Sequence, residues 1–388
     1  MKKEYRFLFV LALILGSIIL TYIARFDFNP SATIIVGDRY YQEYIKQIKS
    51  PIPSGVVIYR DHEFDGQFFY LAALNPLNYD CPASYYYQCA YRYQRIIYPA
   101  LAAVLSLGNA AAIPVLLILV NIVAILVGAY LLMKLLRHYN ANSNYVYLWA
   151  LNVGFVIALT RDLAEPLMFV FILAAFYAFN KDKHITASLF LTLAILTREI
   201  TLLVIAPLLI FLLFRLQIKK FFLYCLPIVV YAIWQALIWQ HFGGVGFKGT
   251  TLLLSAPFLG VWEYLKLTGK PKINFQTELY FLSAWPIIIF CLVQLYVVFR
   301  TWAKNVTFYF LAVVVQSLVL LSLIPKLYTF DAIDGIGRYA TLVFLFSILY
   351  SVERSQRYHP VLLFLAVMMP VVYIVALLGF FYPSYFVT

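Results

Sequence analysis

The stretch IPVLLILVNIVAILVGAYLLMKLL, residues 113–136, decides the fold class of this protein. Its one charged residue, Lys134, stands close to the end of the run, and Asn121 is the only other strongly polar residue in it. A helix crosses the hydrocarbon core of a bilayer with about 20 predominantly apolar residues. The stretch therefore predicts a transmembrane helix.

The composition extends this prediction to the whole chain. Hydrophobic residues make up 64% of the 388 residues and charged residues only 12%, whereas soluble domains carry about 25% charged residues. The 32 tyrosines and 33 phenylalanines suit the aromatic belts at the two membrane surfaces. We therefore expect an all-α polytopic membrane protein with no sizeable soluble domain.

Similar apolar runs recur along the chain and predict eleven spans in a single membrane domain, residues 1–388. The N-terminal run resembles a signal peptide, but its length and the lack of a small-residue cleavage site favour an uncleaved helix. The predicted spans are residues 7–24, 113–136, 145–160, 166–180, 185–199, 200–215, 221–242, 279–300, 306–324, 338–352 and 360–382.

Two longer loops separate these helices. The first, residues 25–112, contains a short apolar run, residues 96–107, that is expected to form a juxtamembrane or re-entrant helix. It is followed by the central helices, 113–242. The second loop, 243–278, contains the stretch 252–267, which is expected to lie along the membrane surface as an interfacial helix before the C-terminal helices, 279–388.

The charges support this arrangement. With a cytoplasmic N-terminus, the segments on the inner side hold 14 of the 29 Lys and Arg residues but only three acids, Glu4, Asp182 and Glu353. The outer side holds the other 15 basic residues and 14 acids. This is the positive-inside bias of membrane proteins. It accounts for nearly all of the net charge of +12, so nucleic-acid binding is not needed to explain that charge.

Ionisable residues that are unusual beside a membrane all fall on the predicted outer face. Charges near the membrane interior cost several kcal/mol unless they are paired or hydrated, so these residues predict an outward-facing polar cavity. They are Asp61, Glu63 and Asp65 in YRDHEFDGQFFY (59–70), Arg161, Asp162 and Glu165 in TRDLAEP, Arg198 and Glu199 in LTREI, and Asp331, Asp334 and Arg338 in FDAIDGIGRY.

Carboxylates and arginines together suit the transfer of a sugar from a lipid phosphate to a hydroxyl group. A carboxylate accepts the proton of the attacking hydroxyl as general base. Arginines hold the phosphate and stabilise the charge that develops on it.

The order of these motifs resembles the GT-C superfamily of integral-membrane glycosyltransferases, which use polyprenyl-phosphate sugars. The matching stretches are DGQFFYLAALNP, YRYQRIIYPALAAVLSLG, TRDLAEP, LTRE and the RY of Arg338–Tyr339, spread over about residues 1–345. More narrowly, they resemble bacterial proteins of cell-surface glycopolymer formation. The spaced acids Asp61 and Asp65 depart from the adjacent acidic pair of many relatives, so which of the two is the base stays open.

The resemblance implies a GT-C-like bundle in a bacterial inner membrane, with an extracytoplasmic site and inversion at the sugar. It implies a polyprenyl-phosphate-linked sugar as donor and a glycan, lipid or protein hydroxyl as acceptor. The expected catalytic residues are Asp65 and, second, Asp61. The expected phosphate ligands are Arg198, Arg338 and Arg161. The residues expected to shape the site are Glu63, Asp162, Glu165, Glu199 and Arg95.

Several alternatives stay open. Asp61, His62 and Asp65 have the ligand types for a divalent cation, but one short cluster does not establish a metal site or any other cofactor. Asp65 is also a good N-cap for a following helix. A disulfide between Cys81 and Cys89 is neither required nor excluded. The competing functions are a transporter or flippase of lipid-linked sugars, an outer-face polymerase or ligase, and a non-catalytic subunit of a glycan assembly complex.

Overall fold

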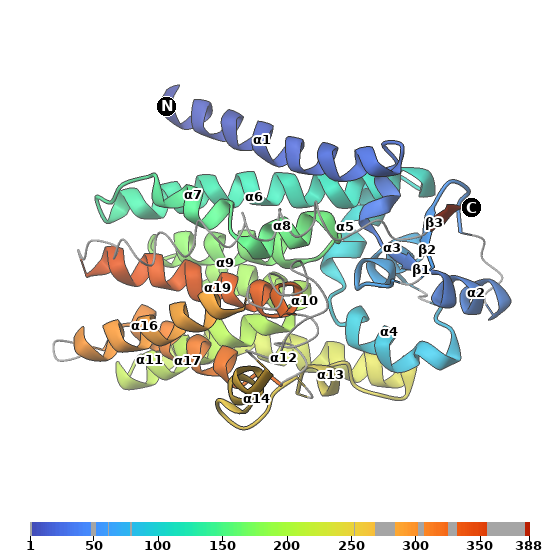
Figure 1. The fold of residues 1–388 in the computed structure, drawn as a ribbon. Helices are drawn as coiled ribbons and strands as arrows, with labels where there is room; N and C mark the ends of the chain where they lie inside the picture. Colours follow the sequence, from blue (N-terminus) through green and yellow to red (C-terminus); the bar gives the residue numbers. More distant parts are fainter. Residues whose placement is uncertain are drawn as a thin grey trace.

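The computed structural model describes residues 2–47, 52–60, 62–77, 80–251, 253–267, 284–301, 306–324, 332–354 and 385–388. Most of these residues are helical, and the long helices lie side by side in one bundle (Figure 1). The all-α class predicted from the apolar runs is therefore confirmed, apart from a small sheet at one end of the bundle.

Four helices in the described part of the chain are long and apolar enough to cross a membrane: Glu4–Phe26, Ala110–His138, Ile218–Phe242 and Gly335–Glu353. They correspond to α1 (Lys2–Ile23), α6 (Ile113–His138), α12 (Ile218–Phe242) and α19 (Ala332–Glu353). Shorter apolar helices pack beside them. These are α9 (Glu165–Phe179), α10 (His184–Thr197), α11 (Leu202–Phe214), α16 (Trp285–Thr301) and α17 (Phe308–Leu321).

Two predicted helices differ in the structure. The single helix expected over 145–160 is divided into α7 (Tyr145–Ala150) and α8 (Val153–Thr160), because Asn152 caps α8 by accepting a hydrogen bond from the backbone of Phe155. The stretch 252–267 is helical only over α14 (Leu259–Leu267), since Leu254 forms a β-bridge with Leu323. The predicted span 360–382 lies outside the described residues.

Two basic segments, around Glu4 and around Arg137, meet at one end of the bundle. Arg137 at the end of α6 pairs with Glu4 at the start of α1. Tyr139, just after α6, lies 3.4 Å from the hydroxyl of Tyr309 at the start of α17. The N-terminus marks this end in Figure 1, and residues 385–388 lie at the opposite end.

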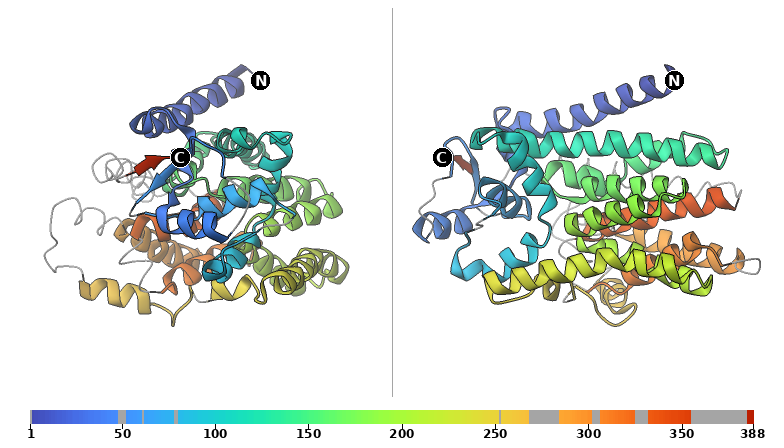
Figure 2. Two further views of the ribbon diagram at one scale, coloured as in Figure 1. Left: turned by 90° about the vertical axis from the view of Figure 1, so that its right-hand side faces the viewer. Right: turned by 180° about the vertical axis from the view of Figure 1, so that it is seen from behind.

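The first loop covers that opposite end with short helices. In the left panel of Figure 2 this end faces the viewer, and the blue and cyan segments of the first loop lie in front of the bundle. The helices are α2 (Asp38–Gln47), α3 (Gly66–Leu74), α4 (Tyr86–Tyr93) and α5 (Ile97–Ser106), and α13 (Phe247–Thr251) packs against α4. Helix α5 is the short apolar helix predicted over 96–107.

A three-stranded sheet joins the first loop to the last described residues. The parallel pair β1 (Val36–Gly37) and β2 (Val57–Tyr59) places Val36 opposite Ile58. Strand β3 (Tyr385–Val387) pairs antiparallel with β2 and places Phe386 opposite Ile58. Strands this short carry little periodic signal in the sequence, so the helical pattern did not predict them.

Two glycines permit the close packing that brings loop and bundle together. A Cβ on Gly66 would stand 2.6 Å from the carbonyl oxygens of both Arg161 and Ile34. A Cβ on Gly154 of α8 would collide with the hydroxyl of Thr341 on α19. The first contact holds Asp65, which precedes Gly66, close to the loop after α8. The second brings α8 and α19 together.

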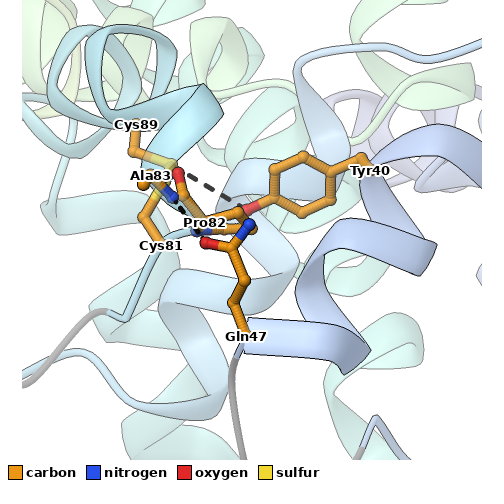
Figure 3. Close-up of a disulfide and its surroundings, with 6 residues drawn as sticks. All are labelled: Tyr40, Gln47, Cys81, Pro82, Ala83 and Cys89. Atoms are coloured by element: carbon orange, nitrogen blue, oxygen red, sulfur yellow. Dashed lines mark hydrogen bonds between the residues drawn. A yellow bond between two sulfur atoms is a disulfide. The ribbon is translucent and has the colours of Figure 1, made fainter.

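A disulfide anchors helix α4. Cys81 and Cys89 are bonded, and the Tyr40 hydroxyl lies 3.9 Å from the Cys89 sulfur (Figure 3). The backbone N–H of Ala83 donates to the side chain of Gln47 on α2 at 2.9 Å. The pairing that the sequence left open is therefore present, and it ties the segment before α4 to both α4 and α2.

Replacing both cysteines by serine is expected to reduce the stability of this region by about 2–3 kcal/mol, because the short loop loses its constraint in the unfolded chain. Thermal unfolding of the purified protein in detergent measures this. Cys225→Ser is the control, since Cys225 is a free, half-buried cysteine outside this region. An unchanged unfolding temperature in the double variant would contradict the expected contribution.

Candidate functional site

Asp65 stands directly before α3 and is surrounded by arginines. Arg92 donates two hydrogen bonds to its Oδ1 atom, from Nη2 at 2.7 Å and from Nε at 3.0 Å. Nη1 of Arg95 and Nη1 of Arg338 each lie 3.5 Å from its Oδ2 atom. Asp65 is the N-cap residue of α3 but makes no side-chain capping hydrogen bond. Capping therefore does not explain this carboxylate.

Arg95 links Asp65 to a second carboxylate. Its Nη2 and Nε atoms donate to Glu199 at 2.7 and 2.8 Å, and both side chains are at most 1% exposed. Glu199 is positioned by a break between helices. Helix α10 ends at Thr197, Arg198 is extended, and Glu199 opens the short 3₁₀ helix η5 (Glu199–Thr201). The charges predicted within one apolar run, 185–215, thus lie at a helix-to-helix turn.

A third carboxylate, Glu165, begins α9. It pairs with Arg198, and its Oε1 atom lies 3.6 Å from Nη1 of Arg338. Glu165 is fully buried, so its charge depends on these two arginines. Arg338 therefore bridges the carboxylates of Asp65 and Glu165.

The ion pairs form one alternating network of four arginines and three carboxylates, with one positive charge in excess. Its members come from the first loop, from α9, from the α10–η5 turn and from α19, so they are far apart in the sequence. They are Arg92, Arg95, Arg198 and Arg338 with Asp65, Glu165 and Glu199. A network with this composition favours an additional anion.

A pocket of about 470 Å³ opens beside the network. Asp65, Arg92, Arg198 and Arg338 line it, and Glu63 stands at its wall. Aromatic rings complete the lining, from Phe64, Phe68, Tyr87, Tyr91 and Tyr339. The pocket thus combines charged groups with flat apolar surfaces, which suits a ligand with both an anionic and an uncharged ring-like part.

The arginines also set the protonation state of Asp65. Partial burial opposes ionisation, but the charges of Arg92, Arg338 and Arg95 outweigh it and hold the pKa of Asp65 well below its ordinary value. Asp65 is therefore ionised at any physiological pH. Because its pKa is low, Asp65 is also a weak base in this arrangement, whereas a general base works best with a pKa near the operating pH.

Two predicted site residues belong neither to the network nor to the pocket lining. Nη1 of Arg161 donates to the hydroxyl of Tyr22 on α1 at 3.1 Å. Asp162 accepts a hydrogen bond from Thr33 at 2.6 Å. Arg161 therefore joins the turn after α8 to α1, whereas Asp162 joins the same turn to the first loop. Asp61 and Asp331 lie outside the described residues, as does the side chain of Asp334.

Asp162 is fully buried in the turn between α8 and α9, outside the candidate spans. Its Oδ1 atom has no hydrogen-bond partner in the described structure. Burial raises the pKa of Asp162 well above its ordinary value, and the hydrogen bond from Thr33 only partly offsets this. Burial therefore favours the neutral, protonated form of the Asp162 carboxyl group.

Asp162→Asn is consequently expected to make stability less dependent on pH. The folded protein retains the Asp162 proton where the unfolded chain has lost it, so wild-type stability falls as pH rises above about 4 toward the folded-state pKa. The asparagine variant lacks this loss. Thermal unfolding between about pH 5 and 8 compares the two slopes, and parallel slopes would contradict the neutral carboxyl. Asp162→Ala removes the hydrogen bond from Thr33 and should cost about 1 kcal/mol, since the Thr33 hydroxyl keeps its contact with the Pro30 carbonyl.

The metal alternative has no further support in the described part of the chain. No three His, Cys, Asp or Glu side chains gather there closely enough to hold an ion. Of the three proposed ligands, His62 and Asp65 are described and Asp61 is not.

Arg92 lines the pocket but was not among the predicted site residues, because its alternation with Tyr91 and Tyr93 is explained equally well by packing at a membrane interface. Its ring contacts are real, since its guanidinium lies 4.7 Å from the Phe68 ring centre and 5.0 Å from that of Tyr91. The spacing of three between Arg92 and Arg95 was the available signal, because it places both side chains on one side of a helical turn.

Comparisons with protein-family models, with characterised proteins and with solved structures found no match for this chain. The site is therefore described from its own geometry, as an arginine-rich pocket at one end of a helical bundle.

Proposed function

We propose that this protein is a GT-C-type glycosyltransferase that moves a sugar from a polyprenyl-phosphate donor to a hydroxyl group outside the cytoplasm. The acceptor is a glycan, a lipid or a protein. One observation carries the proposal: the carboxylate of Asp65 and the guanidinium groups of Arg92, Arg198 and Arg338 line one pocket at the end of apolar helices.

The excess positive charge of the network fits the donor phosphate. Arg92 and Arg338 are partly exposed to the pocket, with 20% and 11% of their side-chain surface accessible, whereas Arg95 is buried against Glu199. The first two are therefore the arginines that can turn from Asp65 to a ligand. Arg198, at 2% exposure, supports the site through Glu165. The aromatic rings suit the uncharged sugar.

In the proposed reaction the donor phosphate takes Arg92 and Arg338 away from Asp65. Asp65 then accepts the proton of the acceptor hydroxyl, whose oxygen forms a bond with the anomeric carbon. The bond between that carbon and the phosphate oxygen breaks, and polyprenyl phosphate leaves with the electron pair, stabilised by the arginines. Attack from the face opposite the phosphate inverts the sugar.

The proposed topology has eleven spans, a cytoplasmic N-terminus and an extracytoplasmic site in a bacterial inner membrane. An odd number of spans places the two chain ends on opposite sides. The pairing of β3 with β2 agrees with this, because it holds residues 385–387 beside the first loop and far from the start of α1. The Arg137–Glu4 ion pair joins two of the basic segments at that end, which supports a cytoplasmic side there under the positive-inside rule.

A transfer assay tests the function. Purified protein in detergent and lipid receives radiolabelled polyprenyl-phosphate sugars and a membrane-glycan extract, and labelled product is measured. Transfer supports an enzyme. Donor binding without transfer to any acceptor would favour a transporter of lipid-linked sugars or a non-catalytic subunit of an assembly complex.

A further inference from the structure

A second pocket, of about 290 Å³, lies at the other end of the bundle, far from Asp65. Helix α1 separates from α6 toward its N-terminal end, as Figure 1 and the right panel of Figure 2 show. The wedge between them is lined by Glu4, Arg6 and Arg137, with Ser143, Asn144 and Tyr147 from the segment that follows α6.

The charges in this pocket favour an anion. Glu4 pairs with Arg137, and its Oε1 atom lies 4.0 Å from Nζ of Lys134. Arg6 has no ion pair or hydrogen bond with any described residue, and neither do the side chains of Ser143 and Asn144. One guanidinium, one hydroxyl and one amide thus face a cavity in which positive charge exceeds negative charge. These are the donors that bind phosphate oxygens.

The surroundings point to a lipid as the source of the phosphate. The pocket lies in the first turns of a candidate membrane span, Glu4–Phe26. Exposed apolar side chains continue from it along α1, where Phe9 is 64% and Leu13 is 56% exposed. Acyl chains would cover this surface while the headgroup enters the wedge.

We propose that the wedge between α1 and α6 binds the phosphate headgroup of an anionic glycerophospholipid, with Arg6 as its main ligand and Ser143 and Asn144 as additional donors. The lipid holds α1 against the bundle at this end. The site is independent of the sugar-transfer function, because no residue of the Asp65 network takes part in it.

Lipid binding to the purified full chain tests the site. Phosphatidylglycerol is titrated against the protein in neutral detergent, and binding is followed by native mass spectrometry and by thermal unfolding. Phosphatidylcholine and inorganic phosphate are the comparison ligands. We expect phosphatidylglycerol to raise the unfolding temperature in a saturable way, and the two comparison ligands to have little effect.

Arg6→Gln should weaken phosphatidylglycerol binding about tenfold, because one charge-assisted contact is lost. Arg6 is exposed, so the lipid-free unfolding temperature should stay unchanged. Arg215→Gln is the matched control, since Arg215 is an exposed arginine at the end of α11, outside the pocket. Wild-type affinity in Arg6→Gln would overturn the site. Equal protection by phosphatidylcholine or by inorganic phosphate would overturn the anionic lipid as its ligand.

Discussion

Asp65→Asn is expected to lower the rate of sugar transfer by about 10²- to 10⁴-fold, the contribution of a positioned general base. The same substitution should leave donor binding intact or tighten it. Asp65 occupies Arg92 and Arg338 in the ligand-free protein, and the neutral amide competes with the donor phosphate less strongly for these arginines. A loss of turnover with unchanged or lower donor Kd is therefore the diagnostic result.

The matched control for this experiment is Glu63→Gln. Glu63 lines the same pocket and is exposed, so the variant removes one carboxylate without breaking the described arginine network. Thermal unfolding checks that each variant is folded. Wild-type transfer by Asp65→Asn would move the base to another acid, with Asp61 the first to examine. Loss of donor binding in a folded Asp65→Asn protein would show that Asp65 contacts the donor itself.

The pH profile offers a second measurement on the same variant. Because the arginines hold the pKa of Asp65 well below its ordinary value, ionisation of the free protein adds no acid limb to kcat/KM near neutral pH. Once the donor phosphate diverts Arg92 and Arg338, the carboxylate loses part of this stabilisation and its pKa rises. The acid limb of kcat should consequently lie at higher pH than that of kcat/KM, and Asp65→Asn should abolish the difference.

Glu199→Gln is expected to produce the largest loss of stability, about 3–5 kcal/mol. Removing one partner of a buried ion pair leaves the other charge buried without compensation. Arg95 is 1% exposed, and its remaining ion pair would be the longer contact with Asp65, at 3.5 Å. Unfolding by denaturant in mixed micelles measures the loss.

An exposed pair provides the control for Glu199→Gln. Lys266 and Glu263 on α14 lie 2.8 Å apart on the surface, and Glu263→Gln should cost less than about 1 kcal/mol. A second comparison replaces both buried partners, as Arg95→Met with Glu199→Leu. This double variant should regain much of the lost stability, because no unpaired charge remains. If Glu199→Gln unfolds like Glu263→Gln, the buried pair contributes nothing beyond a surface contact.

The helices could be predicted because each depends on its own local sequence. Apolar runs located α1, α6 and α12 to within a few residues, and the ionisable clusters located Asp65, Glu165 and Glu199. The partners of these acids could not be predicted, because an ion pair such as Arg95–Glu199 joins residues 104 positions apart. Tertiary packing, such as that of α4 against α12 and of α5 against α10, decides which arginine meets which carboxylate.

The pairing of β2 with β3 has a consequence for the order in which the protein is made. Val57 leaves the ribosome long before Val387, its partner in the sheet. Strand β2, which precedes Asp65, therefore keeps the edge that faces β3 unpaired until nearly all of the chain has been synthesised. The N–H of Thr388 then donates to the carbonyl of Val56, and its own carbonyl accepts from Gly55. Nascent chains halted before this step would expose that edge, which gives quality-control proteases a way to distinguish unfinished molecules from finished ones.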